Sequence, residues 1–315
     1  MLTSRLEAVP ANPLTAVVDA AGAVILGKTE ELRLALACLL ARGHLLIEDV
    51  PGVGKTTLAH LLARLLGLHY ARVQFTSDML PADVIGVSIY DRAGESFRFH
   101  PGPVFSQVLL ADEINRATPK AQSALLEAME ERQVTAEGET RALPEPFFVI
   151  ATQNPAYQVG TFPLPESQLD RFLMRIALGY PAAEQEKALL AGTDRRQLLA
   201  QLRPVLGAAE LIAAQHRADQ VHEAAPDIDY CHALLAYTRG SGRFRHGLSP
   251  RAGLALVRAG KAWALMEGRD YLLPEDVRHV LPAVVSHRLV GGDDNHPGGH
   301  AEVADHLLAA VPVPR

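Results

Sequence analysis

Nine consecutive residues near position 50 leave this chain few possible folds: Asp49-Val50-Pro51-Gly52-Val53-Gly54-Lys55-Thr56-Thr57. An apolar run, Leu45–Ile47, precedes them, and leucines at helical spacing follow them. A strand, a glycine-containing loop that ends in Gly-Lys-Thr, and a helix form the context in which a phosphate-binding loop is expected. The chain is therefore predicted to bind a nucleotide on an α/β fold.

The chemistry of phosphate binding explains these residue types. Backbone N–H groups at the start of the helix surround a phosphate, and glycines permit its close approach. The Lys55 ammonium pairs with the β- and γ-phosphates, and the Thr56 hydroxyl is a ligand for Mg²⁺. The usual pattern opens with glycine where this chain has Asp49, a residue type that tolerates left-handed backbone angles better than most. The predicted nucleotide-binding residues of the loop are Val50, Pro51, Gly52, Val53, Gly54, Lys55, Thr56 and Thr57.

Composition argues against several other classes of protein. The chain has 315 residues, a formal net charge of −6 and a pI near 6.1. Dedicated nucleic-acid-binding proteins usually have an excess of basic over acidic residues, so no nucleic-acid partner is expected. No uncharged apolar run of about 18 residues occurs, which predicts no membrane span. No segment resembles a signal peptide, so we expect a cytoplasmic location. The two cysteines, Cys38 and Cys231, lie in helical patterns and are predicted to be buried thiols.

Five short apolar runs alternate with helical patterns in the first part of the chain and predict a mostly parallel sheet covered on both faces. They are Leu45–Ile47, Val73–Phe75, Val108–Ala111, Phe147–Thr152 and Leu173–Leu178. After Tyr180-Pro181 only helical patterns follow, among them Glu184–Leu190, Leu206–Ala225, Ile228–Arg239, Pro250–Met266 and Pro274–His287. We therefore expect an α/β nucleotide-binding domain at residues 1–180 and a smaller all-α domain at residues 181–315.

Two carboxylates at the end of one predicted strand indicate hydrolysis. The run Val108–Ala111 leads directly into Asp112 and Glu113. Asp112 is placed to hold Mg²⁺ through the water shell of the ion. Glu113 is placed to take a proton from a water molecule that attacks the γ-phosphate in line. A kinase does not need a water-activating carboxylate at this position, whereas a hydrolase does.

Polar residues later in the chain complete the predicted site. Asn154 follows the strand Phe147–Thr152, where its amide can accept from the attacking water and donate to the γ-phosphate. Arg171 precedes the last predicted strand, and Arg251 follows Pro250 at the start of a helix. In this order the arginines are interpreted as cations that stabilise the transition state, one of them supplied to a neighbouring subunit.

Longer phrases of the sequence resemble the MoxR family of AAA+ ATPases. The resemblance runs from about residue 12 to residue 290 and is far more specific than the phosphate-binding loop alone. The phrases are Gln74–Asp83, Gly102–Phe105, Asp112–Ala117, Gln122–Glu131, Gln133–Thr135, Ala151–Pro155 and Leu164–Phe172.

The resemblance implies a Mg²⁺-dependent ATPase that assembles from copies of itself into a hexameric ring. It implies an AAA+ domain with an insert in its second helix, at about residues 76–104, and a hairpin at Val134–Leu143, followed by an all-α lid domain. It also implies that ATP is the bound nucleotide and that Val24, Ile25 and Gly27 line the adenine pocket. The glutamine usual after that glycine is Lys28 in this chain.

The resemblance further assigns roles to the arginines. Arg171 is the expected arginine finger acting in trans, and Arg116 is a competing candidate for that role. Arg251 is expected to be a second sensor that reaches the phosphates from the lid.

The function implied is that of a chaperone-like assembly or remodelling motor that matures protein complexes or inserts metals and cofactors into them. Its implied partner contains a von Willebrand factor A domain. A metal-chelatase motor subunit would have the same fold and site, and a nucleic-acid-linked AAA+ motor is disfavoured by the acidic pI. A small-molecule kinase would need neither Glu113 nor trans-acting arginines. A non-hydrolysing scaffold is disfavoured because every hydrolytic position is occupied.

Overall fold

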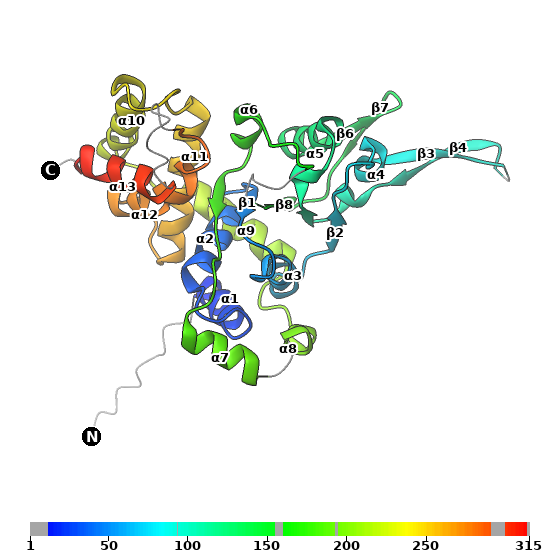
Figure 1. Ribbon diagram of the computed structural model, residues 1–315, viewed down its shortest axis with the longest axis horizontal. Helices are drawn as coiled ribbons and strands as arrows, with labels where there is room; N and C mark the ends of the chain where they lie inside the picture. Colours follow the sequence, from blue (N-terminus) through cyan, green and yellow to red (C-terminus); the bar gives the residue numbers. More distant parts are fainter. Residues whose placement is uncertain (1–11, 93, 155–159, 193–194, 291–299, 314–315) are drawn as a thin grey trace.

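The computed structural model describes residues 12–92, 94–154, 160–192, 195–290 and 300–313 (Figure 1). Residues 1–11 of the predicted N-terminal segment and Pro155 of the Ala151–Pro155 phrase lie outside the described residues. No helix in the described ranges is both long and apolar enough to cross a membrane. Cys38 and Cys231 are free, buried thiols, as predicted.

Five parallel strands form the central sheet in the order β2-β5-β8-β1-β9, which confirms the predicted parallel sheet. Each strand overlaps one predicted apolar run. The strands are β1 (Leu45–Glu48), β2 (Tyr70–Gln74), β5 (Val108–Asp112), β8 (Phe148–Gln153) and β9 (Met174–Ile176). Because they are parallel, all five begin at one edge of the sheet, here called the amino edge, and end at the opposite carboxyl edge.

Two apolar cores lie on the two faces of this sheet. Leu45 and Ile47 of β1 belong to one core, and Leu46 belongs to the other, as the alternation of side chains along a strand requires. The first core includes α1 (Pro13–Gly22), α2 (Thr29–Leu40) and α3 (Lys55–Leu65). The second includes α4 (Pro81–Ile85) and α5 (Pro119–Glu131). The sheet is thus covered on both faces.

After β9 the described chain is helical, as predicted. Helices α11 and α12 pack against each other, and α11 also packs against α9 and against α2 of the first part. The helices are α7 (Ala183–Ala191), α8 (Arg195–Gln201), α9 (Ala208–Gln220), α10 (Ala225–Gly240), α11 (Pro250–Met266), α12 (Pro274–Val285) and α13 (His300–Ala310). The division at residue 180 stays a prediction.

Two hairpins project from the same side of the sheet (Figure 1). One consists of β3 (Gly86–Asp91) and β4 (Ser96–Pro101), and the other of β6 (Gln133–Ala136) and β7 (Glu139–Ala142). They lie side by side, since the Ser88 N–H donates to Glu137 Oε1 at 3.3 Å and the Arg141 guanidinium lies 3.9 Å from the Phe99 ring centre. The first hairpin falls within the predicted insert, residues 76–104, and the second begins one residue before the predicted Val134–Leu143.

Three short helical turns complete the fold. The two 3-10 turns are η1 (Pro103–Phe105), after the first hairpin, and η2 (Ile114–Arg116), after β5. The third is α6 (Glu166–Leu169), which leads toward β9.

Candidate active site

The predicted phosphate-binding loop follows β1 at the carboxyl edge and ends at the first turn of α3. Gly52 and Gly54 have left-handed backbone angles, with φ of 87° and 101°. A Cβ atom at either glycine would meet no other atom within 4 Å, so the space above both is open. Open space beside exposed backbone and a helix start is what a bound phosphate requires.

Asp49, which replaces the usual glycine, is buried and joins the loop to the segment after β9. Its Oδ1 accepts a hydrogen bond from the Val50 N–H at 2.7 Å, and its Oδ2 accepts one from the Gly179 N–H at 2.6 Å. The departure from the usual pattern therefore has a structural role, because the carboxylate holds two backbone donors in place.

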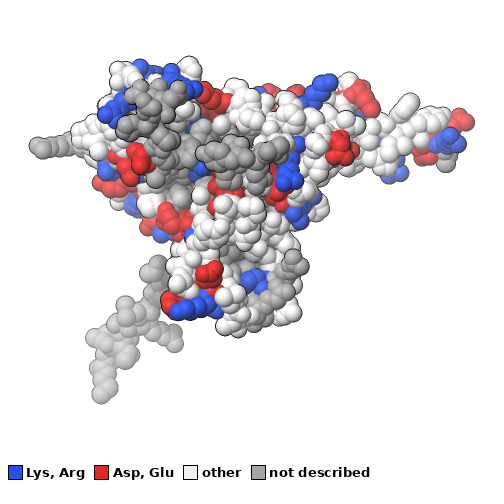
Figure 2. All heavy atoms as spheres, in the orientation of Figure 1, with Lys and Arg blue, Asp and Glu red and all other residues white. Residues whose placement is uncertain are grey.

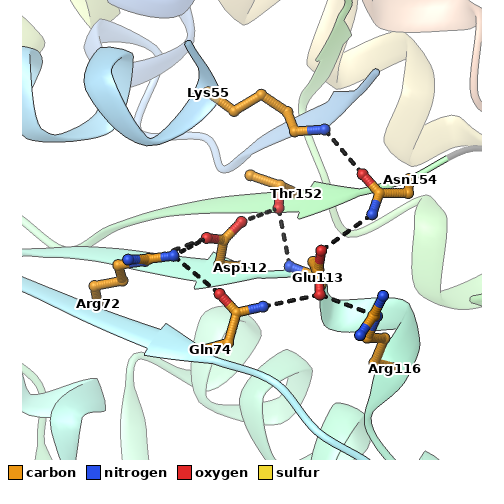
Figure 3. A network of polar contacts seen from close by, with 8 residues as sticks. All are labelled: Lys55, Arg72, Gln74, Asp112, Glu113, Arg116, Thr152 and Asn154. Carbon is orange, nitrogen blue, oxygen red and sulfur yellow. Dashed lines mark hydrogen bonds and ion pairs between the residues drawn. The ribbon is translucent and has the colours of Figure 1, made fainter. Parts of the chain in front are cut away.

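Lys55 connects the loop to the end of β8. Its Nζ donates to the carbonyl oxygens of Asp49 at 2.5 Å and Val50 at 3.2 Å, and to Asn154 Oδ1 at 3.1 Å (Figure 3). Burial lowers the pKa of Lys55, while the nearby carboxylates of Asp49, Asp112 and Glu113 oppose that shift. The ammonium group is thus surrounded by oxygen acceptors, which is the chemistry that phosphate oxygens also offer.

Asp112 ends β5 with both carboxylate oxygens engaged. Its Oδ1 accepts from the Thr152 hydroxyl at 2.6 Å, and its Oδ2 accepts from Arg72 Nη2 at 2.7 Å. Among the described residues, no group of three or more His, Cys, Asp and Glu side chains is arranged to hold a metal ion. Mg²⁺ in nucleotide sites needs only one or two protein oxygens, because phosphates and water supply the rest. Asp112 and the half-buried Thr56 hydroxyl provide oxygen donors of that kind.

Glu113 has a left-handed backbone, with φ of 56°, which is uncommon for a residue with a side chain. Its N–H donates to the Thr152 hydroxyl at 2.9 Å, and its Oε1 accepts from Asn154 Nδ2 at 3.1 Å. Its Oε2 accepts from Gln74 Nε2 at 2.9 Å and lies 3.0 Å from Arg116 Nε (Figure 3). Such unusual backbone angles often occur at functional sites.

Asn154 therefore lies between the predicted phosphate-binding cation and the predicted base. Its side chain accepts from Lys55 and donates to Glu113. The structure brings together Lys55, Asp112, Glu113 and Asn154, four residues that the sequence placed at the ends of one loop and two strands. This arrangement has the groups needed to bind phosphate and to activate water.

Three further members of this network, Arg72, Gln74 and Thr152, were not identified from the sequence. Arg72 and Gln74 are two residues apart on β2, so their side chains lie on the same face of the sheet, and β2 is the neighbour of β5. The sequence did show two polar residues, Arg72 and Gln74, at alternate positions near the end of a predicted strand. They could be assigned to the site only once β2 was known to lie beside β5.

The predicted adenine-pocket residues are connected to the loop through the segment around residue 180. Val24 and Ile25 are buried, and Gly27 has a φ of 69°. The Lys28 ammonium donates to the carbonyl oxygen of Tyr180 at 3.2 Å, next to the Gly179 N–H that bonds to Asp49. The segment around residue 180 therefore links the N-terminal residues to the start of the loop.

Arg171 and Arg251 lie elsewhere, at the amino edge of the sheet. The Leu173 N–H, at the approach to β9, donates to the carbonyl oxygen of His44, which directly precedes β1. Arg171 is therefore separated from the loop by the length of β1, about 16 Å between residues 44 and 49 at the usual rise of a strand. Arg251 approaches the same place, since it and Arg171 both pair with Glu130.

The expectation that Arg251 reaches the phosphates from the lid is therefore not met within one chain. Its guanidinium is directed to α5 at the amino edge, away from Lys55 and Glu113. Arg116, the alternative trans-acting candidate, instead pairs with Glu113 of its own chain.

Comparison with known proteins identifies the family. The family described as "ATPase family associated with various cellular activities (AAA)" matches residues 44–174, and an AAA lid domain matches residues 236–308. The chain is 36% identical to the MoxR protein of Paracoccus denitrificans over 92% of this chain and 93% of that protein. It is 42% identical to chaperone MoxR1 of Mycobacterium tuberculosis, over 85% of this chain and 73% of that protein. This chain belongs to the MoxR family of AAA+ ATPases.

A solved structure supports the same family. The crystal structure of a candidate ATPase from Cytophaga hutchinsonii superposes on this MoxR-family chain with a TM-score of 0.87, 34% identity and 96% coverage of both chains. The chain is thus an ATP-hydrolysing enzyme with a parallel-sheet AAA+ domain followed by a helical lid. The AAA match contains the loop, Asp112, Glu113, Asn154 and Arg171, whereas Arg251 lies within the lid match.

Proposed function

We propose that this MoxR-family ATPase works as a homo-oligomeric ring, of hexameric form, with each ATP bound between two copies. The observation that carries the proposal is the separation of the predicted catalytic groups within one chain. The loop, Asp112 and Glu113 occupy the carboxyl edge of the sheet, whereas Arg171 and Arg251 occupy the amino edge. A second copy must supply the arginines if they act on the same nucleotide.

In this proposal one copy binds ATP and activates water. The loop and Lys55 hold the β- and γ-phosphates, and Thr56 and Asp112 would hold Mg²⁺, which neutralises charge on the phosphates when bound. Asn154 orients the attacking water, and Glu113 takes its proton as the water oxygen bonds to the γ-phosphorus. The bond from that phosphorus to the bridging oxygen breaks, and ADP and phosphate leave.

The neighbouring copy stabilises the charge that develops in this step. We assign the trans-acting role to Arg171 together with Arg251, and give Arg116 a role within its own chain. The support is electrostatic. Arg116 Nε lies 3.0 Å from Glu113 Oε2, so the positive charge of Arg116 stabilises the carboxylate that accepts the proton in its own chain. Arg171 and Arg251 lie in a cleft that contains six arginines and two acidic residues, an excess of positive charge that suits an incoming phosphate.

The work proposed for the ring is chaperone-like. Hydrolysis would move the lid, residues 181–315, against the nucleotide-binding domain, residues 1–180, and so remodel a bound protein complex in the cytoplasm. The proposed partner has a von Willebrand factor A domain, and the proposed outcome is maturation of a client, including insertion of a metal or cofactor. Relatives named as MoxR and as a MoxR chaperone support this class of function.

A dilution experiment tests the shared site. Wild-type chains are mixed with an excess of Glu113→Gln/Arg171→Ala chains, which cannot hydrolyse ATP and cannot supply Arg171. We expect the ATPase rate per wild-type chain to fall roughly in proportion to the fraction of double-variant chains. Chains with Glu113→Gln alone are the control, because they still supply Arg171 and leave the wild-type rate higher.

A second measurement supports the first. If the site is shared, the rate per wild-type chain rises with protein concentration until assembly is complete. A rate that neither dilution mixture changes would contradict the shared site and would favour a self-contained phosphohydrolase.

A further inference from the structure

We infer that Glu130 positions both trans-acting arginines for the neighbouring copy's ATP, an inference that rests on the shared site proposed above. Glu130 lies in the last turn of α5, with one carboxylate oxygen for each arginine. Its Oε2 is 3.2 Å from Arg171 Nε, and its Oε1 accepts a hydrogen bond from Arg251 Nη2. The two arginines come from different elements, the segment before β9 and the first turn of α11.

The contacts leave part of each guanidinium available for an anion. Arg171 Nη1 donates to the carbonyl oxygen of Leu126 at 2.6 Å, so α5 engages the Nε and Nη1 groups of this arginine. Within the described parts of the chain, Arg171 Nη2 and the Nε and Nη1 groups of Arg251 donate no hydrogen bond. Guanidinium N–H groups in this state match the geometry of phosphate oxygens.

The surrounding charge explains why a carboxylate is needed at this position. The cleft has a volume of about 390 Å³, and its acidic residues are Glu130 and Asp170. Asp170 is already engaged, because it lies 2.7 Å from Arg288 Nε and accepts from the Ser249 hydroxyl at 3.1 Å. Glu130 is therefore the acid that offsets the mutual repulsion of Arg171 and Arg251 and permits two cations to approach one phosphate.

Stability alone does not account for this arrangement. The side chains of Glu130, Arg171 and Arg251 are 33%, 30% and 48% exposed, and ion pairs as exposed as these add little to folding stability. A shared carboxylate does, however, fix the spacing of two long side chains before the phosphate arrives. Groups held ready in this way lose less entropy in the transition state.

Steady-state kinetics give the first test. Glu130→Gln removes the charge and keeps the shape, so we expect kcat to fall about tenfold while KM and the affinity for a fluorescent ATP analogue stay as in wild type. Glu130→Asp keeps the negative charge, so its kcat should lie between those of Glu130→Gln and the wild type. Glu127→Gln is the matched control, because Glu127 is an exposed residue of the same helix, and it should behave as wild type. An unchanged kcat in Glu130→Gln would overturn the inference, as would an equal loss in Glu127→Gln.

Mixing shows on which copy Glu130 acts. An excess of Glu113→Gln/Glu130→Gln chains should lower the rate per wild-type chain, whereas Glu113→Gln/Glu127→Gln chains should not. Glu113→Gln/Arg171→Ala chains serve as the reference. If only the Arg171→Ala mixture lowers the rate, the shared site stands and the role of Glu130 is refuted. If no mixture lowers it, both the shared site and this inference fail.

Discussion

Glu113, the proposed catalytic base, illustrates how neighbouring residues hold one side chain in place. Its left-handed backbone turns the chain sharply after β5, and donors from Gln74, Asn154 and Arg116 surround its carboxylate. These contacts fix the position of the proposed base, which the sequence could only place at the end of a strand.

The corresponding prediction concerns Glu113→Gln. The amide keeps the shape but cannot take a proton, so phosphate release should fall at least about a hundredfold. Nucleotide binding should persist because the loop and Lys55 are unchanged, and titration with a fluorescent ATP analogue measures it. Glu131→Gln, an exposed change on α5, is the control. Normal turnover by Glu113→Gln would show that another group is the base.

His44 is a buried residue whose charge state affects stability. Its Nδ1 accepts from the Val149 N–H at 3.0 Å and its Nε2 contacts the Met129 carbonyl oxygen at 3.2 Å, so the neutral ring joins β8 to α5. Burial lowers the pKa of His44 from 6.5 to about 4, and the carbonyl contact only partly opposes this.

The lowered pKa predicts a pH dependence with a definite sign. Between pH 6.5 and 4 the unfolded chain binds a proton at His44 that the folded chain does not, so stability falls as the pH falls through this window. The loss at its lower end is about 3 kcal/mol. Urea unfolding of wild type and His44→Asn at several pH values measures it, and the variant should show the shallower dependence. Equal slopes would contradict the prediction.

At the scale of elements, apolar runs were sufficient to predict the strands, because the strands β1, β5 and β8 are buried almost throughout their length. The run that predicted β2 covers only the end of that strand, since Val73 is its one buried residue. The order of the strands was not available from such runs. β2 lies beside β5 although the first hairpin separates them in the chain, and this pairing brings Arg72 and Gln74 to Asp112 and Glu113. The convergence of Arg171 and Arg251 on Glu130 likewise depends on how α11 packs, which residue spacing does not reveal.

The segment that bears Arg171 is held by α12 and the residues just after it. Arg288 has a side chain only 5% exposed, pairs with Asp170 at 2.7 Å, and donates to the carbonyl oxygens of Phe172 at 2.6 Å and Leu173 at 3.1 Å. Together with the Ser249 and His287 side chains, this buried cation connects the lid to the approach of β9.

We predict that Arg288→Ala destabilises the chain by about 3–5 kcal/mol, because it removes the buried cation that pairs with Asp170 and donates to several carbonyl oxygens. Arg258→Ala, which removes an exposed arginine from the same cleft, should change stability much less. Denaturant unfolding compares the two. Similar stabilities for both variants would show that the Arg288 contacts do not hold the lid in place.

At the scale of the whole molecule, the proposed assembly is built from copies of one chain. Acidic and basic residues are interspersed over the face shown in Figure 2, in keeping with the formal net charge of −6. The two halves of the proposed site lie at opposite edges of one sheet, and such head-to-tail contacts close into rings when the rotation between copies permits.

Complementation between two inactive variants is the sharpest test of a site shared between copies. Glu113→Gln chains lack the base but supply both arginines, and Arg171→Ala chains keep the base but lack the arginine. Each should be nearly inactive alone. In a random equal mixture, about a quarter of the interfaces pair an intact base with intact arginines, so we expect recovery of about a quarter of the wild-type ATPase rate. A mixture no more active than its two components would contradict it.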